Sequence, residues 1–203
     1  MSISGLRFGA LGDRIVHVAV DMQELFARDS EWASPVTLAI APLVARIAAH
    51  RPHRTIFTRF LPPRAAHEAA GQWQAYYRRW ESVLASRNDP ALYDLLAMLR
   101  PFVPPAKVID KATHSAFETP AFQLALDALG TDTVVFSGVE TDVCVLATAM
   151  TAIDRGLRTI LVSDALASSS EAGHASAMAA IYPRFDQQIE VIDTTTLLEG
   201  WNR

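Results

Sequence analysis

The chain of 203 residues contains one cysteine, Cys144, and no apolar run as long as a membrane-spanning helix requires. One cysteine excludes an internal disulfide framework and a cysteine-rich zinc site, and it fits a reducing compartment. The N-terminal stretch lacks the charged, apolar and small-residue order of a signal peptide. We therefore expect a cytoplasmic protein that is neither exported nor inserted in a membrane.

A strong charge of either sign is also missing. The 18 basic and 22 acidic residues leave a net charge of −4, and no basic cluster indicates a nucleic-acid partner. A glycine-rich phosphate loop is absent, because Gly5, Gly9 and Gly12 precede the first apolar segment instead of following it. Half of the residues are hydrophobic and a fifth are charged, which is typical of a globular domain. The length favours a single domain, residues 1–203.

Short apolar runs rich in β-branched residues predict a series of strands that alternate with helices. The strands are expected over residues 15–20, 55–60, 107–110, 133–136, 159–163 and 189–192. Helices are expected over residues 36–50, 89–99, 120–129 and 141–156, and after Ser170. Uninterrupted apolar strands joined by helices predict an α/β fold in three α/β/α layers, with a doubly wound, mostly parallel six-stranded sheet.

Three chemically complementary residues stand at the carboxyl ends of predicted strands. Asp21 follows the first strand, Lys111 ends the third and Cys144 follows the fourth. In such a sheet these ends share one edge, where ligands bind, so we expect the three side chains to converge. Each also has a plain structural interpretation: a turn residue for Asp21, a solvated charge for Lys111 and a packed apolar side chain for Cys144.

Cys144 lies where a strand turns into a helix for which Thr141 is the expected N-cap. The first turn of a helix offers free N–H groups and the positive end of the dipole, which stabilise a thiolate and can hold an oxyanion. Cys144 is therefore a candidate nucleophile.

Around these residues the chain resembles the isochorismatase-like cysteine hydrolases, a superfamily that includes nicotinamidase, N-carbamoylsarcosine amidase and ureidoacrylate amidase. The matching segments span most of the sequence. They are Val20-Asp21-Met22-Gln23 with Phe26, residues 111–117, residues 138–145 with Thr148-Ala149, and Ser163-Asp164-Ala165.

The resemblance implies that Asp21, Lys111 and Cys144 form a catalytic triad. It also implies a cis peptide bond between Val139 and Glu140, and an oxyanion hole made by the N–H groups of Glu140 and Cys144. The implied activity is hydrolysis of a C–N bond in a small amide or ureido substrate through a thioester, with release of ammonia. The implied assembly is a homodimer or homotetramer.

The residues also suggest features of the substrate pocket. Arg59 ends the second strand and is a candidate clamp for a substrate carboxylate, although a structural role is equally open. Phe26, Phe60, Trp73 and Phe117 are candidate pocket walls or plain core residues. Some relatives carry a metal on an Asp-x-His pair after the second strand, but this chain has Thr58-Arg59-Phe60 there. We therefore expect no metal and no cofactor.

Several alternatives remain open at this point. An isochorismatase proper cleaves a vinyl ether and needs no thiol, so Cys144 favours an amidase. A Cys-His hydrolase would use His114, which is otherwise a pocket or structural residue. A non-enzymatic α/β module would bind a nucleotide or a partner protein. The segment 61–87, with its Tyr76–Trp80 run, is a lid or a subunit contact.

Overall fold

The computed structural model describes residues 5–201 and contains one six-stranded sheet. The strand order is β3-β2-β1-β4-β5-β6, and every pair is parallel. The strands are β1 (Ile15–Val20), β2 (Thr55–Phe60), β3 (Lys107–Lys111), β4 (Thr133–Val139), β5 (Arg158–Ala167) and β6 (Ile189–Ile192). The predicted fold class, with its parallel doubly wound sheet, is confirmed.

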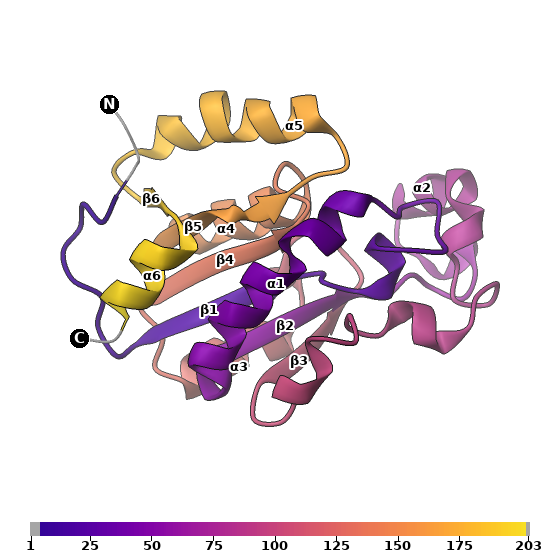
Figure 1. Cartoon of the computed structure of the whole chain (residues 1–203). Coiled ribbons are helices and arrows are strands. Elements are labelled where there is room, and N and C mark those ends of the chain that lie inside the picture. The colour runs from indigo at the N-terminus through magenta and orange to yellow at the C-terminus, as the bar shows by residue number, and fades with distance from the viewer. Residues whose placement is uncertain (1–4, 202–203) are drawn as a thin grey trace.

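Helices cover both faces of the sheet. In Figure 1, α1 and α6 lie in front of the strands, and α3 and α4 lie behind them. The helices are α1 (Pro35–His50), α2 (Trp73–Arg79), α3 (Pro120–Ala128), α4 (Cys144–Asp154), α5 (Glu171–Ser176) and α6 (Thr194–Gly200). No helix within residues 5–201 has the length and apolar character needed to cross a bilayer.

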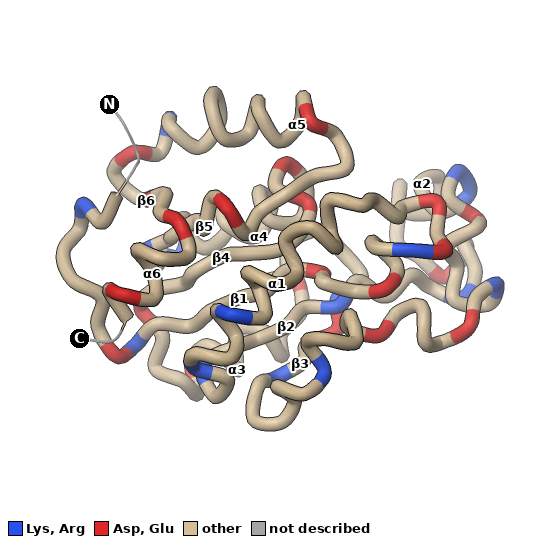
Figure 2. Tube along the Cα trace, viewed as in Figure 1, with Lys and Arg blue, Asp and Glu red and all other residues tan. Residues whose placement is uncertain are grey.

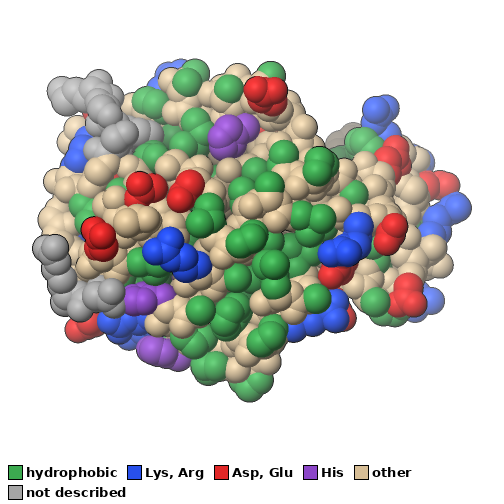
Figure 3. All heavy atoms as spheres, in the orientation of Figure 1, with side chains coloured by type: hydrophobic (Ala, Val, Ile, Leu, Met, Phe, Trp, Pro, Cys, Tyr) green, Lys and Arg blue, Asp and Glu red, His purple; other side chains and the backbone are tan. Residues whose placement is uncertain are grey.

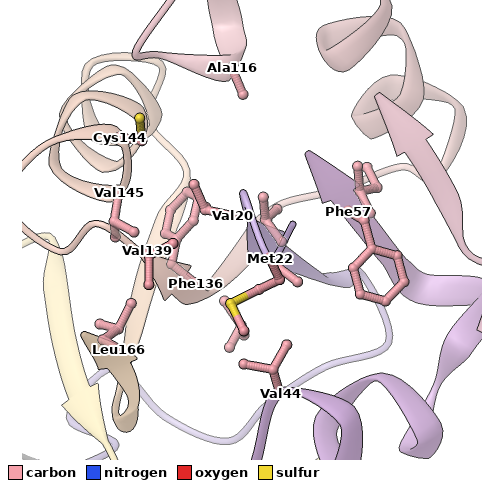
Figure 4. Packing of buried hydrophobic residues seen from close by; sticks show 14 of the residues in the cluster. Val20, Met22, Val44, Phe57, Ala116, Phe136, Val139, Cys144, Val145 and Leu166 are labelled. Carbon is pink, nitrogen blue, oxygen red and sulfur yellow. The ribbon is translucent and has the colours of Figure 1, made fainter. Parts of the chain in front are cut away.

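The core explains why the central strands are apolar throughout. Every residue of β1 and β4 is buried, since each strand is covered on both faces and flanked on both sides. Figure 4 shows Val20, Met22 and Phe136 packed between the helical segments that carry Val44 and Cys144. This packing makes the sheet a rigid support for the residues at the ends of its strands.

Gly138 sets the distance between the two strands that flank the site. Its φ is 105°, and a Cβ there would lie 2.1 Å from the carbonyl oxygen of Val20. Only glycine fits this close approach. β1 and β4 therefore end side by side, with Val20 in register with Gly138.

Two local predictions were wrong, and one helix was not predicted. The helix expected over 89–99 is a short 3₁₀ turn, Pro90–Tyr93, because the chain beyond it extends and Leu96 N–H donates to the Met22 carbonyl. Thr141 is not the N-cap of α4, which begins at Cys144 after Val143. Helix α6 was not anticipated.

Candidate active site

The three strand-end residues converge at the carboxyl edge of the sheet. The Lys111 Nζ lies 2.8 Å from Asp21 Oδ2, and both side chains are fully buried. The Cys144 side chain lies close enough to both for their charges to act on its thiol. The chain passes from β1 to β2 and then to the edge strand β3, and it returns to β4 on the other side of β1, so the cluster lies at the topological switch point.

Strand β2 holds this cluster together, a role that the sequence analysis did not predict. The Thr58 Oγ1 donates to Asp21 Oδ1 at 2.6 Å and accepts from the Asp21 backbone N–H at 3.1 Å. The Phe60 ring covers Lys111, whose Nζ lies 4.6 Å from the ring centroid. Gln23 fixes Phe60 in turn, since its side chain bonds both the N–H and the carbonyl of Phe60.

Asp21 itself has an unusual backbone conformation. Its φ is 52°, in the left-handed region that few residues other than glycine adopt. Non-glycine residues in this region cluster at functional sites, where the surrounding structure enforces them. Here the two bonds to Thr58 hold the residue.

The electrostatics of the thiol differ from the expectation. Burial raises the pKa of Cys144; Lys111 opposes this shift and the Asp21 carboxylate adds to it. Burial also lowers the pKa of Lys111, but Asp21 and Cys144 raise it by more. Burial therefore works against the free thiolate that the helix start alone would favour, while the adjacent Lys111 and Asp21 act on the thiol in opposite directions.

A cavity of about 390 Å³ opens beside the thiol. It includes Cys144, so the sulfur is not sealed from access although the residue is 6% exposed. The lining comes from the loop before α1, from β2, from α2, and from the segments around His114 and Cys144. The lining residues are Phe26, Glu31, Trp32, Ala33, Phe60, Tyr76, Trp80, His114, Glu140, Val143, Cys144 and Ser169.

A family model described as the isochorismatase domain matches residues 16–195, which is most of the chain. The chain belongs to the isochorismatase family. Within residues 5–201 this isochorismatase domain takes in the six strands, apart from Ile15, and the helices α1 to α5; most of α6 lies beyond the match.

Solved structures with the same fold include relatives with and without a stated activity. An isochorismatase family protein from Desulfovibrio vulgaris subsp. vulgaris str. Hildenborough superposes with a TM-score of 0.77 at 19% identity, covering 95% of this chain and 100% of that one. A cysteine hydrolase from Pseudomonas syringae pv. phaseolicola 1448A gives 0.74 at 24%, covering 93% and 92%. N-carbamoylsarcosine amidase from Thermoplasma acidophilum gives 0.69 at 23%, covering 89% and 96%.

The backbone of this isochorismatase domain next to the sulfur has a special geometry. The Val139–Glu140 peptide bond is cis, as the resemblance implies. In the described part of the chain, residues 5–201, neither the Glu140 N–H nor the Cys144 N–H donates a hydrogen bond to a backbone carbonyl of a turn or loop. The Glu140 side chain accepts from the N–H of Ser169 at 2.9 Å, which ties this segment to the end of β5.

The predicted pocket residues divide into two groups. Phe26 and Phe60 line the cavity, and Trp73 lies behind it, against the ring of His114 at 4.8 Å between centroids. Phe117 does not line it, since its ring packs on Phe122 at 4.9 Å in the core. The sequence analysis missed Glu31 and Trp32, which a loop presents without any periodic pattern.

Arg59 is not a clamp in this pocket. Successive side chains of a strand point to opposite faces, so Thr58 and Phe60 face the cluster and Arg59 faces away. Its guanidinium binds Asp110 at 2.7 Å and Asp94 at 2.9 Å. The prediction of a carboxylated substrate rested on Arg59 and is withdrawn with it.

The residues at the expected metal position do not fit a metal. The hydroxyl of Thr58 is committed to Asp21, and Phe60 offers only a ring that already covers Lys111. In the part of the chain that the structure describes, no group of three or more His, Cys, Asp or Glu side chains is placed to hold a metal ion. We derive no chemical step through a metal.

The sequence allows two interpretations of the segment 61–87, a lid or a subunit contact. Its helix α2 and the following turn supply Tyr76 and Trp80 to the cavity. The segment therefore forms one wall of the pocket within this chain. In Figure 1 it projects beyond the carboxyl ends of the strands.

Proposed function

We propose that this protein is a cysteine-dependent amidohydrolase that cleaves a C–N bond of a small amide or ureido substrate and releases ammonia. The observation that carries the proposal is the buried Lys111–Asp21 ion pair beside a thiol that faces a cavity. Relatives with the same fold include proteins named as a cysteine hydrolase and an N-carbamoylsarcosine amidase, which supports this class of reaction.

The first half of the reaction forms a thioester. The carboxylate of Asp21 takes the thiol proton while the Cys144 sulfur bonds to the carbonyl carbon, and Lys111 stabilises the developing thiolate charge. The oxyanion receives hydrogen bonds from the N–H groups of Glu140 and Cys144. Asp21 then gives its proton to the leaving nitrogen as the C–N bond breaks.

The second half regenerates the enzyme. Water loses a proton to Asp21 as its oxygen bonds to the thioester carbon, and the C–S bond then breaks. The sulfur recovers the proton from Asp21, so the cycle consumes one water and yields an acid and ammonia. The raised pKa of Cys144 suits this cycle, because the thiol needs to ionise only as it attacks.

His114 offers a competing base. Its Nδ1 lies 3.8 Å from the Cys144 Sγ, so a Cys-His mechanism is the competing alternative. Burial and the charge of Lys111 lower the pKa of His114, and Asp21 only partly opposes this. We assign proton transfer to Asp21, whose carboxylate is paired with Lys111 at 2.8 Å and whose charge acts on the thiol.

The test is an ammonia-release screen over small amides, ureido acids and nicotinamide, with Cys144→Ser, Asp21→Asn and His114→Gln beside the wild type. We expect the first two variants to lose at least about 10³-fold in kcat, as the removal of a nucleophile or its proton acceptor does. His114→Gln should retain most activity. A covalent adduct on Cys144, observed by mass spectrometry after rapid acid quenching, would report the thioester.

Three results would contradict the assignment. Ammonia release that is indifferent to Cys144→Ser would exclude the thiol, and hydrolysis of a vinyl ether by that variant would favour the isochorismatase reaction. Loss of activity in His114→Gln with retention in Asp21→Asn would favour the Cys-His mechanism.

We also propose a homo-oligomer in the cytoplasm. Figure 3 shows hydrophobic side chains gathered over the face that carries α1, where Leu38 is 40% exposed. Such a patch is typical of a protein contact surface. Light scattering on the purified protein would measure the mass, and a monomer would contradict this part of the proposal.

A further inference from the structure

The cavity has an aromatic wall, formed by Phe26, Trp32, Tyr76 and Trp80. Trp32 is its centre, with its ring centroid 5.9 Å from Phe26, 5.9 Å from Tyr76 and 6.0 Å from Trp80. The planes of Trp32 and Trp80 meet at 70°, and those of Trp32 and Tyr76 at 50°. Phe26 stacks on Trp32 with 13° between their planes, whereas Tyr76 is tilted and Trp80 is edge-on, so the wall combines ring faces and ring edges.

The charged groups of the cavity are negative. Glu31 and Glu140 both line it, and no lysine or arginine among residues 5–201 does. Lys111 lies below the Phe60 ring and is neutralised by Asp21. The pKa of His114 is lowered, so its ring is neutral at neutral pH. Figure 2 shows acidic and basic residues mixed around α2, without a patch of one sign there.

The carboxylates of Glu31 and Glu140 use only part of their hydrogen-bonding capacity in contacts within the chain. Glu31 is exposed at the rim, and one oxygen accepts from the hydroxyl of Ser82 at 2.5 Å. One oxygen of Glu140 accepts from Ser169. An anionic substrate would meet these two negative charges with no compensating cation, whereas a positive group would be attracted by both.

Aromatic faces supply the rest of the recognition. The π-electrons of tryptophan and tyrosine attract a cation that is close to the ring, and a quaternary ammonium needs no hydrogen-bond acceptor. Trp80 already accepts one cation of this chain, since the guanidinium carbon of Arg79 lies 5.1 Å from its ring centroid. Arg79 is exposed and does not line the cavity.

We propose that the substrate is an amide whose distal end carries a trimethylammonium-type cation, bound by the aromatic wall and Glu31 while the scissile carbonyl lies at Cys144. This inference rests on the proposed amidohydrolase function and specifies its substrate class. It also reverses the anionic substrate that the sequence suggested through Arg59.

The test compares primary amides that differ only in the distal group. Three series carry trimethylammonium, tert-butyl or carboxylate, each joined to the amide carbon by one, two or three methylenes. The tert-butyl group matches the shape of the cation without its charge. We expect kcat/KM for the best cationic amide to exceed that of its tert-butyl match by about tenfold or more, as cation–π and carboxylate contacts provide. The carboxylate series should be the poorest.

Variants separate recognition from chemistry. Glu31→Gln should lower the preference for the cation over its tert-butyl match at least about threefold, with the loss in KM and little change in kcat. Glu199→Gln removes an exposed carboxylate from α6, at the far end of the molecule in Figure 1, and should leave the preference unchanged. Binding of the cationic amides to Cys144→Ala, followed by calorimetry, gives a readout that needs no turnover.

The two proposals fail in different ways. Tight, Glu31-dependent binding without ammonia release by the wild type would reject the amidase chemistry and support the cation site. Release of ammonia with the tert-butyl or carboxylate series preferred would overturn the cation site and leave the amidase chemistry standing. Equal binding of the cationic and tert-butyl amides to Cys144→Ala would also overturn it.

Discussion

Lys111 and Asp21 form an ion pair in which both side chains are fully buried, with 2.8 Å between Nζ and Oδ2. The ammonium also donates to the carbonyl of Thr113 at 3.0 Å, and the Phe60 ring covers it. Water is excluded from such a pair, so each charge depends on the other for its stability. This dependence can be measured without any knowledge of the substrate.

Lys111→Met should destabilise the fold by about 3–5 kcal/mol, because it leaves the Asp21 carboxylate buried without its partner. The urea midpoint would report the change. Adding Asp21→Asn should recover part of the loss, since the pair would then be replaced by two neutral groups. Arg14→Met is the matched control: its pair with Asp132 is 68% and 47% exposed, so the loss should be below about 1 kcal/mol.

If Lys111→Met and the double variant were equally unstable, the pair would not be coupled as its geometry indicates. If Lys111→Met matched Arg14→Met, the ion pair would be hydrated in solution.

The same two charges should move the thiol pKa in opposite directions. Asp21 raises the pKa of Cys144 and Lys111 lowers it. Asp21→Asn should therefore give a thiol that reacts with iodoacetamide at lower pH than the wild type, although the variant no longer turns over. Lys111→Met should require a higher pH. Because the chain has one cysteine, the alkylation rate reports this site alone.

If the wild-type thiol reached its full alkylation rate at neutral pH, burial would not be the dominant influence on the pKa of Cys144. The control is the urea-unfolded state, in which the wild type and the two variants should show the same ordinary thiol pKa.

Much of the site was predictable because it follows from topology. Asp21, Lys111 and Cys144 each end or follow a buried strand, and a parallel sheet brings such ends to one edge. The strands themselves were predicted well, since apolar runs buried on both faces leave a strong pattern. Helix α6, by contrast, is short and begins with three threonines, which are poor helix formers.

The substrate pocket was less predictable, and for two different reasons. Arg59 was placed wrongly although the strand period was available: Thr58 and Phe60 face the cluster, so their neighbour has to face away. Trp32 and Glu31 come from a loop, where no period relates a side chain to its direction. The packing of that loop against α2 and β2 brings them to the cavity beside Cys144.

Gly138→Ala should be among the most damaging small substitutions in the chain. The new Cβ would lie 2.1 Å from the Val20 carbonyl oxygen, and the φ of 105° is unfavourable for alanine. We expect a loss of about 3 kcal/mol or more in the free energy of unfolding, because two packed strands must separate. Activity should fall further than stability, since Asp21 directly follows β1 and the cis Val139–Glu140 bond ends β4.

Gly12→Ala provides the comparison, because its Cβ would meet no atom within 4 Å and its φ is not positive. It should change the unfolding free energy by less than about 1 kcal/mol. Similar thermal unfolding curves for the two variants would show that the strand spacing tolerates a side chain.

His17 should make the fold sensitive to acid independently of the active site. It is fully buried in β1, with Nε2 2.7 Å from the hydroxyl of Ser137, and burial lowers its pKa from 6.5 to about 3. Between these pH values the unfolded chain binds a proton that the folded chain does not, so stability falls as the pH drops from 6.5 towards 3. Above pH 6.5 the contribution of His17 to stability is complete.

The variant His17→Gln keeps a hydrogen-bonding side chain but has no titrating ring. It should be less stable at pH 7 but should show a smaller decrease in urea midpoint between pH 6.5 and 4. Parallel pH profiles for the two proteins would assign the acid sensitivity to the carboxylates instead.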